Sequence, residues 1–416
     1  MLKLRDWFSP WYVVYVLFGA LAVGIVPILI PLSVSSAGAG SIGIIMAALN
    51  IGGLFAGGFG FLCDRYRLHR AVVLSGLGIV AVAIGLFPEF PGLLPRVVLA
   101  LLAGTGMAAV STVANLLIVE VYPKEQWDSR IGWFQTFYGI GQVAGLLLAG
   151  LFSSRISEGL LITSAIGAAA LIVAAYTVRT PRKPPVPVRA KPAVIRHGEW
   201  AISSPGRAHH NVSMHALRNL KSIFSSQFGI FLIGWLFVYT GATGIFSLYP
   251  VLYQSLFKVS PVLSSAGFAV AAAAGLFLYA PSGRLSDRIG TLSVLNASVL
   301  IRILAFLCLW ILTFFPAHST GAASLLVFGV IVLAWSPISV SSVAFTAASS
   351  SLGEGEAMGL YNAASGAAAI AGSLAGGGIA AAAGYRTVPL LAAGLLSIGL
   401  FINVRFLKTP AKRGAA

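Results

Sequence analysis

The chain has 416 residues, of which 58% are hydrophobic and only 9% are charged. Soluble proteins carry about 25% charged residues, so this composition excludes an ordinary water-soluble protein and makes lipid the main solvent. The formal charge of +16 would suggest a nucleic-acid partner in a soluble protein, but no folded basic domain supports that interpretation and we expect no such partner.

Six long apolar segments precede residue 179, and each is long enough to cross the membrane as a helix. The first is too long for a signal peptide and lacks an Ala-x-Ala-like cleavage site at its end, so it counts as a span. The predicted spans of this half are 11–36, 40–62, 71–88, 93–121, 131–153 and 159–178.

The chain changes character at Arg179. From there to Gln227 it is polar, basic and initially rich in proline, which is typical of a linker between two halves. We therefore predict an N-terminal six-helix bundle (1–178), a basic cytoplasmic linker (179–227) and a C-terminal six-helix bundle (228–416). The predicted spans of the second half are 228–257, 262–283, 292–315, 321–347, 357–383 and 386–407.

The positive charges set the predicted orientation. With the N-terminus in the cytoplasm, all but five of the 27 Lys and Arg residues fall in cytoplasmic loops and tails, as the positive-inside rule requires. We therefore predict a multi-pass protein of the cell (inner) membrane with both termini in the cytoplasm. The five exceptions are Arg96, Arg155, Lys258, Arg302 and Arg386.

Small residues crowd the second, fifth, eighth and eleventh spans. Lipid gives helices no hydrophobic reason to associate, so close backbone contact at small residues is expected to hold them together. We predict such packing faces at Gly53-x-x-x-Gly57, Gly141-x-x-x-Gly145 and Gly372-x-x-x-Gly376.

Two near-matching charged turns interrupt this apolar chain. The first is Gly60-Phe-Leu-Cys-Asp-Arg-Tyr-Arg67 and the second is Gly283-Arg-Leu-Ser-Asp-Arg-Ile-Gly290. Both share Gly-x-Leu-x-Asp-Arg, and each falls between the second and third span of its half. A motif repeated at corresponding places indicates internal duplication, which is how many carriers build two halves around a central site.

The two turns resemble the hallmark loop of the major facilitator superfamily, and the likeness extends over the twelve spans, the 6+6 layout and the central linker. The resemblance implies an all-α integral membrane fold of two pseudo-symmetric six-helix bundles around a cavity that opens to each side in turn. It also implies a cytoplasmic latch, with Asp64 near the start of the eleventh span, Asp287 near the start of the fifth, and basic residues of the first loop paired with Glu120. The implied latch residues are Gly60, Asp64, Arg65, Arg67, Arg70, Glu120, Gly283, Asp287, Arg288 and Gly290.

The first loop departs from the family pattern. Arg67 stands where the family has glycine, and Leu68 follows it where the family has arginine. Arg65, Arg67 and Arg70 are the candidates to replace that lost basic partner, with plain anchoring by positive charge as the alternative. The fifth span also lacks the kinking proline of drug–proton antiporters, since Leu146 stands in its place. This weakens the antiporter interpretation without excluding it.

By resemblance, spans 1, 4, 7 and 10 line the cavity and spans 2, 5, 8 and 11 flank it. We expect helix interruptions at Gly241-Ala-Thr-Gly244 and Pro250 in the seventh span, and at Pro337 in the tenth. Any single polar residue of these spans could equally bond a neighbouring helix. The set of polar and aromatic residues as a whole is therefore stronger evidence for a substrate cavity than any one of its members. The members are Tyr15, Asn50, Arg96, Asn115, Gln135, Tyr138, Gln142, Tyr239, Thr243, Tyr249, Trp335, Tyr361, Asn362 and, more peripherally, Arg302.

The middle of the membrane is short of charge. None of the 11 acidic residues lies in the middle of a predicted span, which leaves no obvious titratable group for proton coupling. Arg302 is the only clearly central ionisable residue, and it is either a substrate contact that holds an anion or a structural residue that bonds helix ends or snorkels. Arg96 either substitutes for an arginine that proton-coupled relatives carry in the fourth span or snorkels to the external interface.

These features predict a transporter rather than an enzyme. No His-Glu-x-x-His, Gly-x-Ser-x-Gly or carboxylate cluster occurs within a span, and we expect no metal or cofactor. The first interpretation is efflux of small amphipathic organic compounds, which suits an aromatic, weakly charged cavity. The second is a facilitator or exchanger of small organic anions such as carboxylates, which suits the lack of buried acid. We expect a monomer in the lipid bilayer that binds a small-molecule substrate. Whether an ion is coupled to transport is left open. A scaffold or sensor that no longer transports is the remaining alternative.

Overall fold

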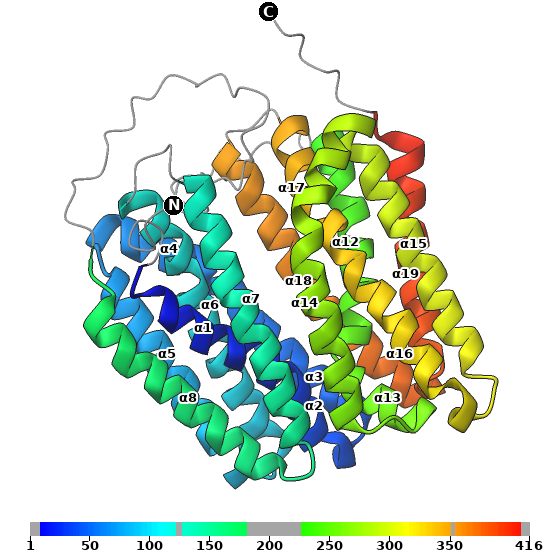
Figure 1. Cartoon of the computed structure of the whole chain (residues 1–416), viewed down its shortest axis with the longest axis horizontal. Coiled ribbons are helices and arrows are strands. Elements are labelled where there is room, and N and C mark those ends of the chain that lie inside the picture. The colour runs from blue at the N-terminus through cyan, green and yellow to red at the C-terminus, as the bar shows by residue number, and fades with distance from the viewer. Residues whose placement is uncertain (1–8, 122–126, 181–225, 351–353, 409–416) are drawn as a thin grey trace, which may run out of the picture.

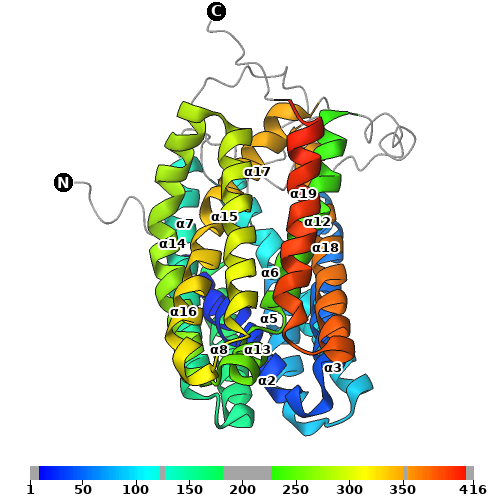
Figure 2. The same cartoon turned by 90° about the vertical axis from the view of Figure 1, so that its right-hand side faces the viewer.

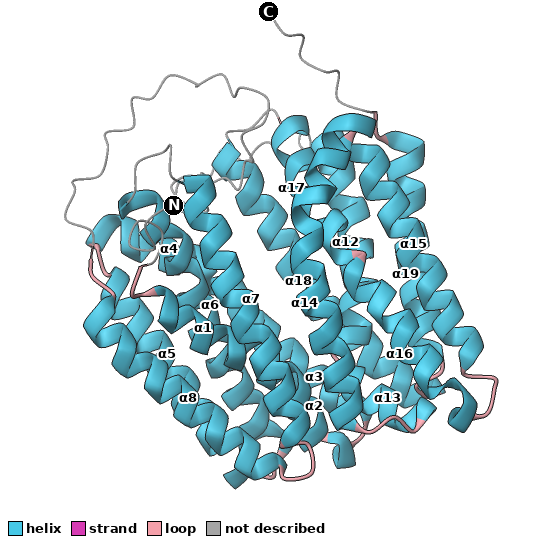
Figure 3. Ribbon diagram, viewed as in Figure 1, coloured by secondary structure: helices cyan, strands magenta, loops and turns pink. Residues whose placement is uncertain are grey.

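The computed structural model describes residues 9–121, 127–180, 226–350 and 354–408. Within these ranges it is helical without strands, and it has 12 apolar helical stretches long enough to cross a membrane. This confirms the predicted all-α membrane fold and its twelve spans, which Figure 3 shows as long helices joined by short loops. The predicted linker, 179–227, lies almost entirely outside the described residues.

The first half contributes six spans, two of which change helix type midway. The first span runs through α1 (Tyr12–Gly19), the π-helix η2 (Ala20–Ile25) and α2 (Val26–Ser33). The second runs through α3 (Ala39–Ile51), the 3₁₀ segment η4 (Gly52–Phe55) and α4 (Ala56–Tyr66). The other four spans are α5 (His69–Leu86), α6 (Leu93–Val121), α7 (Trp127–Leu151) and α8 (Ile156–Thr177).

The second half repeats the plan, with two spans that break before a proline. The seventh span consists of α12 (Gln227–Phe246) and α13 (Tyr249–Phe257), and the tenth of α16 (Ala317–Leu333) and α17 (Trp335–Ser349). The unbroken spans are α14 (Pro261–Ile289), α15 (Thr291–Leu312), α18 (Glu354–Ala383) and α19 (Thr387–Phe406).

Proline sets both breaks, as the sequence predicts. Pro250 lies in the first turn of α13 and Pro337 in the first turn of α17, where a missing N–H removes no helical hydrogen bond. The segment from Gly241 to Gly244 was predicted as a further interruption, and this is wrong, because it forms regular helix inside α12. These two glycines serve helix contact instead, since a Cβ on Gly241 would lie 2.9 Å from the carbonyl oxygen of Ala392 in α19.

The helices form two bundles, one from each half of the chain (Figure 1). In the first bundle, α5 packs against α6 and α8, and α7 packs along α1 and η2. In the second, α12 packs on α18 and α19, and α15 packs on α16, α17 and α19. Figure 2 shows this second bundle from its outer side.

Few helices join the bundles to each other. The joining pairs are α3 with α18, η4 with α18, α7 with α14, and α2 with α13. We call the end that carries the repeated turns, at Arg67 and Gly290, the motif end, and the other the opposite end. Because α2, α3 and α13 belong to the opposite-end halves of their spans, the bundles contact each other mainly in the middle and at the opposite end (Figure 1, lower part).

The fifth span packs on the first by backbone contact. A Cβ added to Gly141 would collide with the carbonyl oxygen of Val16, and one added to Gly145 would collide with that of Ala20. In the second bundle α18 approaches α12 in the same way through Gly372. The Gly141/Gly145 and Gly372/Gly376 packing faces are therefore confirmed, and the two bundles use them at corresponding places.

The remaining predicted packing face is wrong at its first residue. A Cβ on Gly53 would meet no atom within 4 Å, because η4 turns this residue away from the neighbouring helices. The adjacent Gly52 makes the contact instead, and a Cβ there would collide with the backbone of Gly104 in α6. The local change to 3₁₀ geometry shifts the contact by one residue.

Three adjacent glycines of α18 have different surroundings. A Cβ on Gly376 would lie 2.6 Å from the carbonyl oxygen of Gly244, in the same bundle, and one on Gly377 would lie 2.6 Å from the Cα of Gly43, in the other bundle. A Cβ on Gly378 would meet nothing within 4 Å.

We predict that Gly376→Ala lowers the thermal stability of the purified protein by about 1–3 kcal/mol, because the methyl group overpacks the bundle. Gly378→Ala is the matched control and should be neutral or slightly stabilising, since alanine favours helix. Gly377→Ala should spare the bundle and weaken the contact between bundles. Melting curves in detergent check the series, and equal melting temperatures for Gly376→Ala and Gly378→Ala would contradict it.

Candidate functional site

The two repeated turns share one backbone plan. After α4, the N–H of Arg67 donates to the carbonyl oxygen of Cys63 at 2.8 Å, and after α14 the N–H of Gly290 donates to that of Ser286 at 3.0 Å. In each turn the donor is the last residue of the motif and the acceptor lies four residues earlier. The likeness seen in the sequence is therefore also a likeness of structure.

The backbone explains the glycine of the family pattern. The last residue of each turn has a positive φ, 56° at Arg67 and 94° at Gly290. Glycine adopts such values freely, whereas a side chain makes them strained. Arg67 therefore keeps the turn although it departs from the pattern, and it does so at a cost in backbone energy.

The predicted latch is only partly within the described structure. The side chains of Asp287 and Arg288 are exposed and form no ion pair with any described residue. Arg65 is exposed too, with its guanidinium carbon 5.8 Å from the ring centroid of Tyr66. Gly60 and Gly283 are buried in their helices. The side chains of Asp64 and Glu120 lie outside the described residues, so the latch pairing stays a prediction.

Arg70 makes a contact within its own bundle. Its Nη2 donates to the carbonyl oxygen of Ala175, 2.8 Å away at the C-terminal end of α8. A cation at this end of a helix is favoured by the exposed carbonyls of its last turn. Arg70 therefore ties α5 to α8, and its place in the latch stays a prediction.

Asn50 lies in the seam between the bundles. Its Nδ2 donates to the Oγ of Ser373 in α18 at 3.1 Å. Ser373 is fully buried; its hydroxyl donates to the carbonyl oxygen of Ala369 at 2.9 Å and lies 2.8 Å from the Oγ of Ser247, at the break of the seventh span. One hydroxyl thus uses its donor and both acceptor positions to join spans 2, 7 and 11.

Tyr15 and Tyr138 belong to an aromatic cluster of the first bundle, together with Phe134 and other rings of α1 and α7. The ring of Tyr15 lies 5.1 Å from that of Phe134, which lies 6.1 Å from that of Tyr138. The hydroxyl of Tyr15 donates to the carbonyl oxygen of Val110 in α6 at 3.1 Å, and its side chain is fully buried. Tyr138 is half-buried, so it is the member of this pair that a solute could reach.

A second group, which we call the Trp235 cluster, lies where α12, α17 and α18 meet. The ring of Trp235 lies 5.5 Å from that of Tyr239, 5.1 Å from that of Tyr361 and 6.3 Å from that of Trp335. Its Nε1 donates to the Oγ of Ser365 at 2.8 Å. Tyr239 and Trp335 are half-buried, whereas Trp235 and Tyr361 are buried.

Arg302 lies beside this cluster and is 1% exposed. Its guanidinium carbon lies 5.4 Å from the ring centroid of Phe246, 5.8 Å from that of Phe306 and 5.6 Å from that of Trp335. Its Nε and Nη1 are buried and have no hydrogen-bond partner among the described residues. Arg302 therefore does not snorkel, and its Nε and Nη1 bond no helix end among the described residues, whereas its role as a contact for an anion stays a prediction.

Three other predicted cavity residues have their polar atoms occupied. Tyr249 is buried and donates to the carbonyl oxygen of Ser264 at 2.7 Å, and Thr243 donates to that of Tyr239, within its own helix, at 2.9 Å. Arg96 lies at the opposite end, where its Nε donates to the carbonyl oxygen of Phe90 at 2.8 Å. These contacts indicate structural roles and speak against the inclusion of these residues in a cavity.

The remaining members of the set are less constrained. Gln142 is half-buried, whereas Gln135 and Asn362 are exposed. The side chain of Asn115 lies outside the described residues. The structure thus groups Tyr239, Trp335, Tyr361 and Arg302 in one bundle and Tyr15 with Tyr138 in the other; these placements leave their role in transport a prediction.

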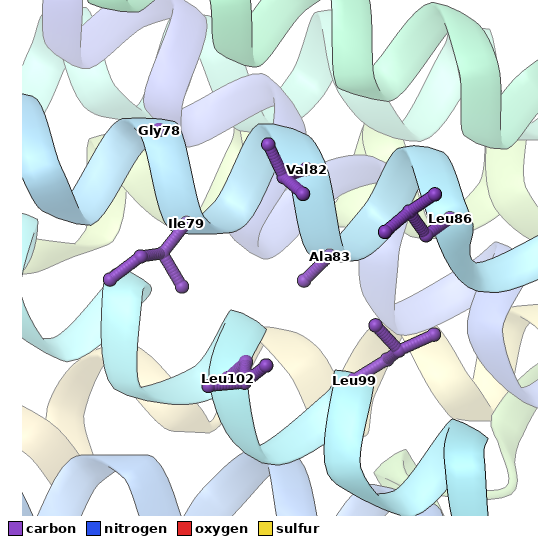
Figure 4. A pocket seen from close by; sticks show the side chains of 7 residues that line it. All are labelled: Gly78, Ile79, Val82, Ala83, Leu86, Leu99 and Leu102. Atoms are coloured by element: carbon purple, nitrogen blue, oxygen red, sulfur yellow. The ribbon is translucent and has the colours of Figure 1, made fainter.

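A groove of about 310 Å³ lies elsewhere, between α5 and α6 (Figure 4). Its lining is entirely apolar and includes Ile79, Val82 and Leu102, all of them exposed. Exposed apolar side chains in the middle of a span face lipid in a membrane. The groove is therefore no candidate for polar substrate binding. The described residues also contain no group of His, Cys, Asp or Glu side chains that could hold a metal ion.

Sequence reasoning missed the residues that connect the site. Ser373 lies in an Ala- and Gly-rich helix and Ser247 at the break that follows α12, and a lone serine gives no signal of its own in either place. Trp235 was overlooked because it is apolar in character, although it contacts three of the predicted residues. The position four residues before Tyr239, on the same helix face, was the available clue.

Comparison with known proteins identifies the family. The family model of the Major Facilitator Superfamily matches residues 11–354. A search of curated proteins finds no match. Three similar solved structures are the nucleoside transporter NupG (15% identity, TM-score 0.75, covering 95% of this chain and 97% of that one), the inward-open xylose transporter XylE from E. coli (13%, 0.71, 97% and 96%), and an inward-facing, occupied bacterial homologue of the human lysosomal transporter Spinster (14%, 0.67, 95% and 95%).

The turn geometry gives a paired prediction. Arg67→Gly should be neutral or stabilise the protein by up to about 1 kcal/mol, because it removes backbone strain. Gly290→Ala should destabilise it by about 1 kcal/mol or more, because its φ of 94° disfavours any side chain. Melting temperatures in detergent test the pair, and loss of stability in Arg67→Gly alone would show that its side chain outweighs the backbone strain.

The seam gives a second prediction. The reporter is a cysteine that replaces the buried Ala39 at the opposite end, in a protein whose two native cysteines are replaced by serine. Asn50→Ala and Ser373→Ala should each raise the rate at which this cysteine reacts with a maleimide by up to about fivefold. The reason is that loss of one hydrogen bond between the bundles favours opening of the opposite end.

The double variant should react little faster than either single variant, since both remove the same bond. Ser41→Ala is the control, because the hydroxyl of Ser41 donates to the carbonyl oxygen of Ala37, in the turn just before its own helix and not in the other bundle. Additive effects of the two seam variants would show that they act separately.

Proposed function

The chain belongs to the major facilitator superfamily, whose members transport small solutes across membranes, and we propose that it moves a small organic solute by alternating access between its two bundles. The observation that carries the proposal is the uneven contact between bundles. The α3–α18, α7–α14 and α2–α13 seams hold the middle and the opposite end together, whereas Asp287 and Arg288 at the motif end form no ion pair with any described residue. Two rigid bundles that rock about this seam would open one end as they close the other.

The motif end is cytoplasmic in this proposal. The described basic residues at that end include Arg65, Arg130, Arg284 and Arg405, and the basic segment 179–227 connects there. The positive-inside rule then places both termini in the cytoplasm of a cell inner membrane. The structure would accordingly correspond to a state in which the external end is closed.

We propose efflux of small amphipathic organic compounds as the transport activity. The two aromatic clusters lie on spans that line or flank the cavity by resemblance, and Tyr138 and Tyr239 present half-buried rings with polar tips. Aromatic side chains bind large apolar surfaces and orient ligands by stacking. A single chain contains both bundles, so a monomer suffices; a coupling ion is left open because no acidic residue lies in the middle of a span.

Transport of small organic anions is the second candidate, and the unpartnered Arg302 is the observation that favours it. A substrate panel in reconstituted vesicles separates the two. Export of lipophilic cations would eliminate the anion candidate, because an acid-free cavity beside an arginine should repel them. Uptake of carboxylates alone would eliminate general amphipathic efflux.

The repeated turns give the prediction for this activity. Asp64→Asn should impair flux severely and leave membrane insertion intact, because it removes the charge of the latch and no apolar surface. Flux in reconstituted vesicles and the amount of inserted protein are the two measurements. Glu158→Gln is the control, since Glu158 pairs with Arg155 at the exposed opposite end. Normal flux in Asp64→Asn would exclude the latch role.

A further inference from the structure

We propose that Arg302 and the rings beside it form a binding site for the carboxylate of an aromatic organic acid. The proposal rests on the proposed transport function, because it names the substrate class that the same bundle would bind. It is carried by three observations: the missing counter-charge of Arg302, the rings that surround its guanidinium, and the half-buried position of Trp335, the member of the Trp235 cluster that contacts it.

No acidic residue of the second half of the chain lies near Arg302 along the helix bundle. The half of the chain from Gln227 onward contains three acidic residues, Asp287, Glu354 and Glu356, and all three lie at or near the motif end. Arg302 lies 11 residues into α15, which corresponds to about 16 Å of helix at 1.5 Å per residue. A side-chain carboxylate cannot span that distance, and Arg302 forms no ion pair with any described residue.

A buried arginine without a partner is unfavourable. Arginine stays protonated in proteins, so the charge persists on burial. Removing an unpaired charge from water is costly. The three rings offset part of this cost through cation–π contacts, but they leave Nε and Nη1 without acceptors. An anion with two oxygen atoms would satisfy the guanidinium through two parallel hydrogen bonds.

The surrounding rings select an aromatic acid. Trp335 contacts both Arg302 and Tyr239. The guanidinium carbon of Arg302 lies 5.6 Å from the ring centroid of Trp335, and the ring centroids of Trp335 and Tyr239 are 5.8 Å apart. A ligand whose carboxylate reached Arg302 would therefore place its own ring among Trp335, Tyr239 and Trp235. Ring stacking there adds to the affinity that burial of apolar area provides.

Trp335 is the side chain that must move to admit the ligand. It is half-buried and is the first residue of α17, directly after the break of the tenth span at Ala334. The ligand would enter when the indole rotates about its own side-chain torsions, which needs no bending of α16 or α17. Arg302 itself comes from α15 and stays within the bundle.

Equilibrium binding to the purified full-length protein in detergent tests the site. The probes are benzoate and benzamide, which share a ring and differ in charge, and calorimetry measures their affinities. We expect wild type to prefer benzoate and Arg302→Gln to lose about 10- to 100-fold in benzoate affinity, with little change for benzamide, as for removal of a charged bidentate pair. Arg302→Lys should be intermediate, because it keeps the charge and loses the fork.

Arg386→Gln is the matched control, since Arg386 is an exposed arginine at the opposite end of the same bundle, and it should bind like wild type. Benzoate should also raise the melting temperature of wild type and not that of Arg302→Gln. Equal affinity for the two probes, or unchanged benzoate affinity in Arg302→Gln, would overturn the site. Failure of both Arg302 variants to fold would also overturn it, because Arg302 would then be a structural residue.

The binding result is independent of transport. Benzoate binding that depends on Arg302, without benzoate flux in vesicles, would keep the site and contradict the proposed transport of this class. Flux of benzoate that does not change in Arg302→Gln would keep transport and overturn the site.

Discussion

Close contact between helix backbones is the constraint on which this structure depends. Lipid removes the hydrophobic force between helices, so the spans must approach until backbone atoms touch. Gly141 and Gly145 allow this for the fifth and first spans, and Gly372 and Gly376 allow it for the eleventh and seventh. The same chemistry at corresponding places makes each bundle a rigid unit, which a rocking transporter requires. Because Gly377 faces the other bundle, the seam between the bundles includes contacts of the same kind.

Departures from regular helix occur where the chain must bend or turn. The π-helix η2 lies where the first span packs on α7, and π segments are frequent at functional sites. The breaks before Pro250 and Pro337 divide the seventh and the tenth span, both in the second half of the chain. The Asn50, Ser373 and Ser247 hydroxyl and amide groups meet next to the first of these breaks. The hydrogen bond between the bundles, from Asn50 to Ser373, thus lies next to the break of the seventh span.

Charged side chains are nearly absent from the middle of the protein, and Arg302 is the exception because it is buried in the middle of a span. The first bundle offers an aromatic cluster without a central charge, whereas the second offers an aromatic cluster with one. The halves agree in helix packing and in the repeated turns but differ in this respect. A duplicated scaffold can keep its moving parts alike and still assign ligand recognition mainly to one half.

The sequence by itself determined the twelve spans, the duplicated turns and the proline breaks. Each of these depends on local physics: apolar length, a motif of a few adjacent residues, or a missing N–H. It could not determine which glycine makes contact around η4, nor that Arg70 and Arg96 bond carbonyl oxygens within their bundle. It also could not show that Tyr249 is internally satisfied or that Ser373 connects three spans. Those outcomes depend on which helix faces meet in space, and for Arg70 and Ser373 the partners lie more than 100 positions away in the sequence, so only the tertiary structure brings them together.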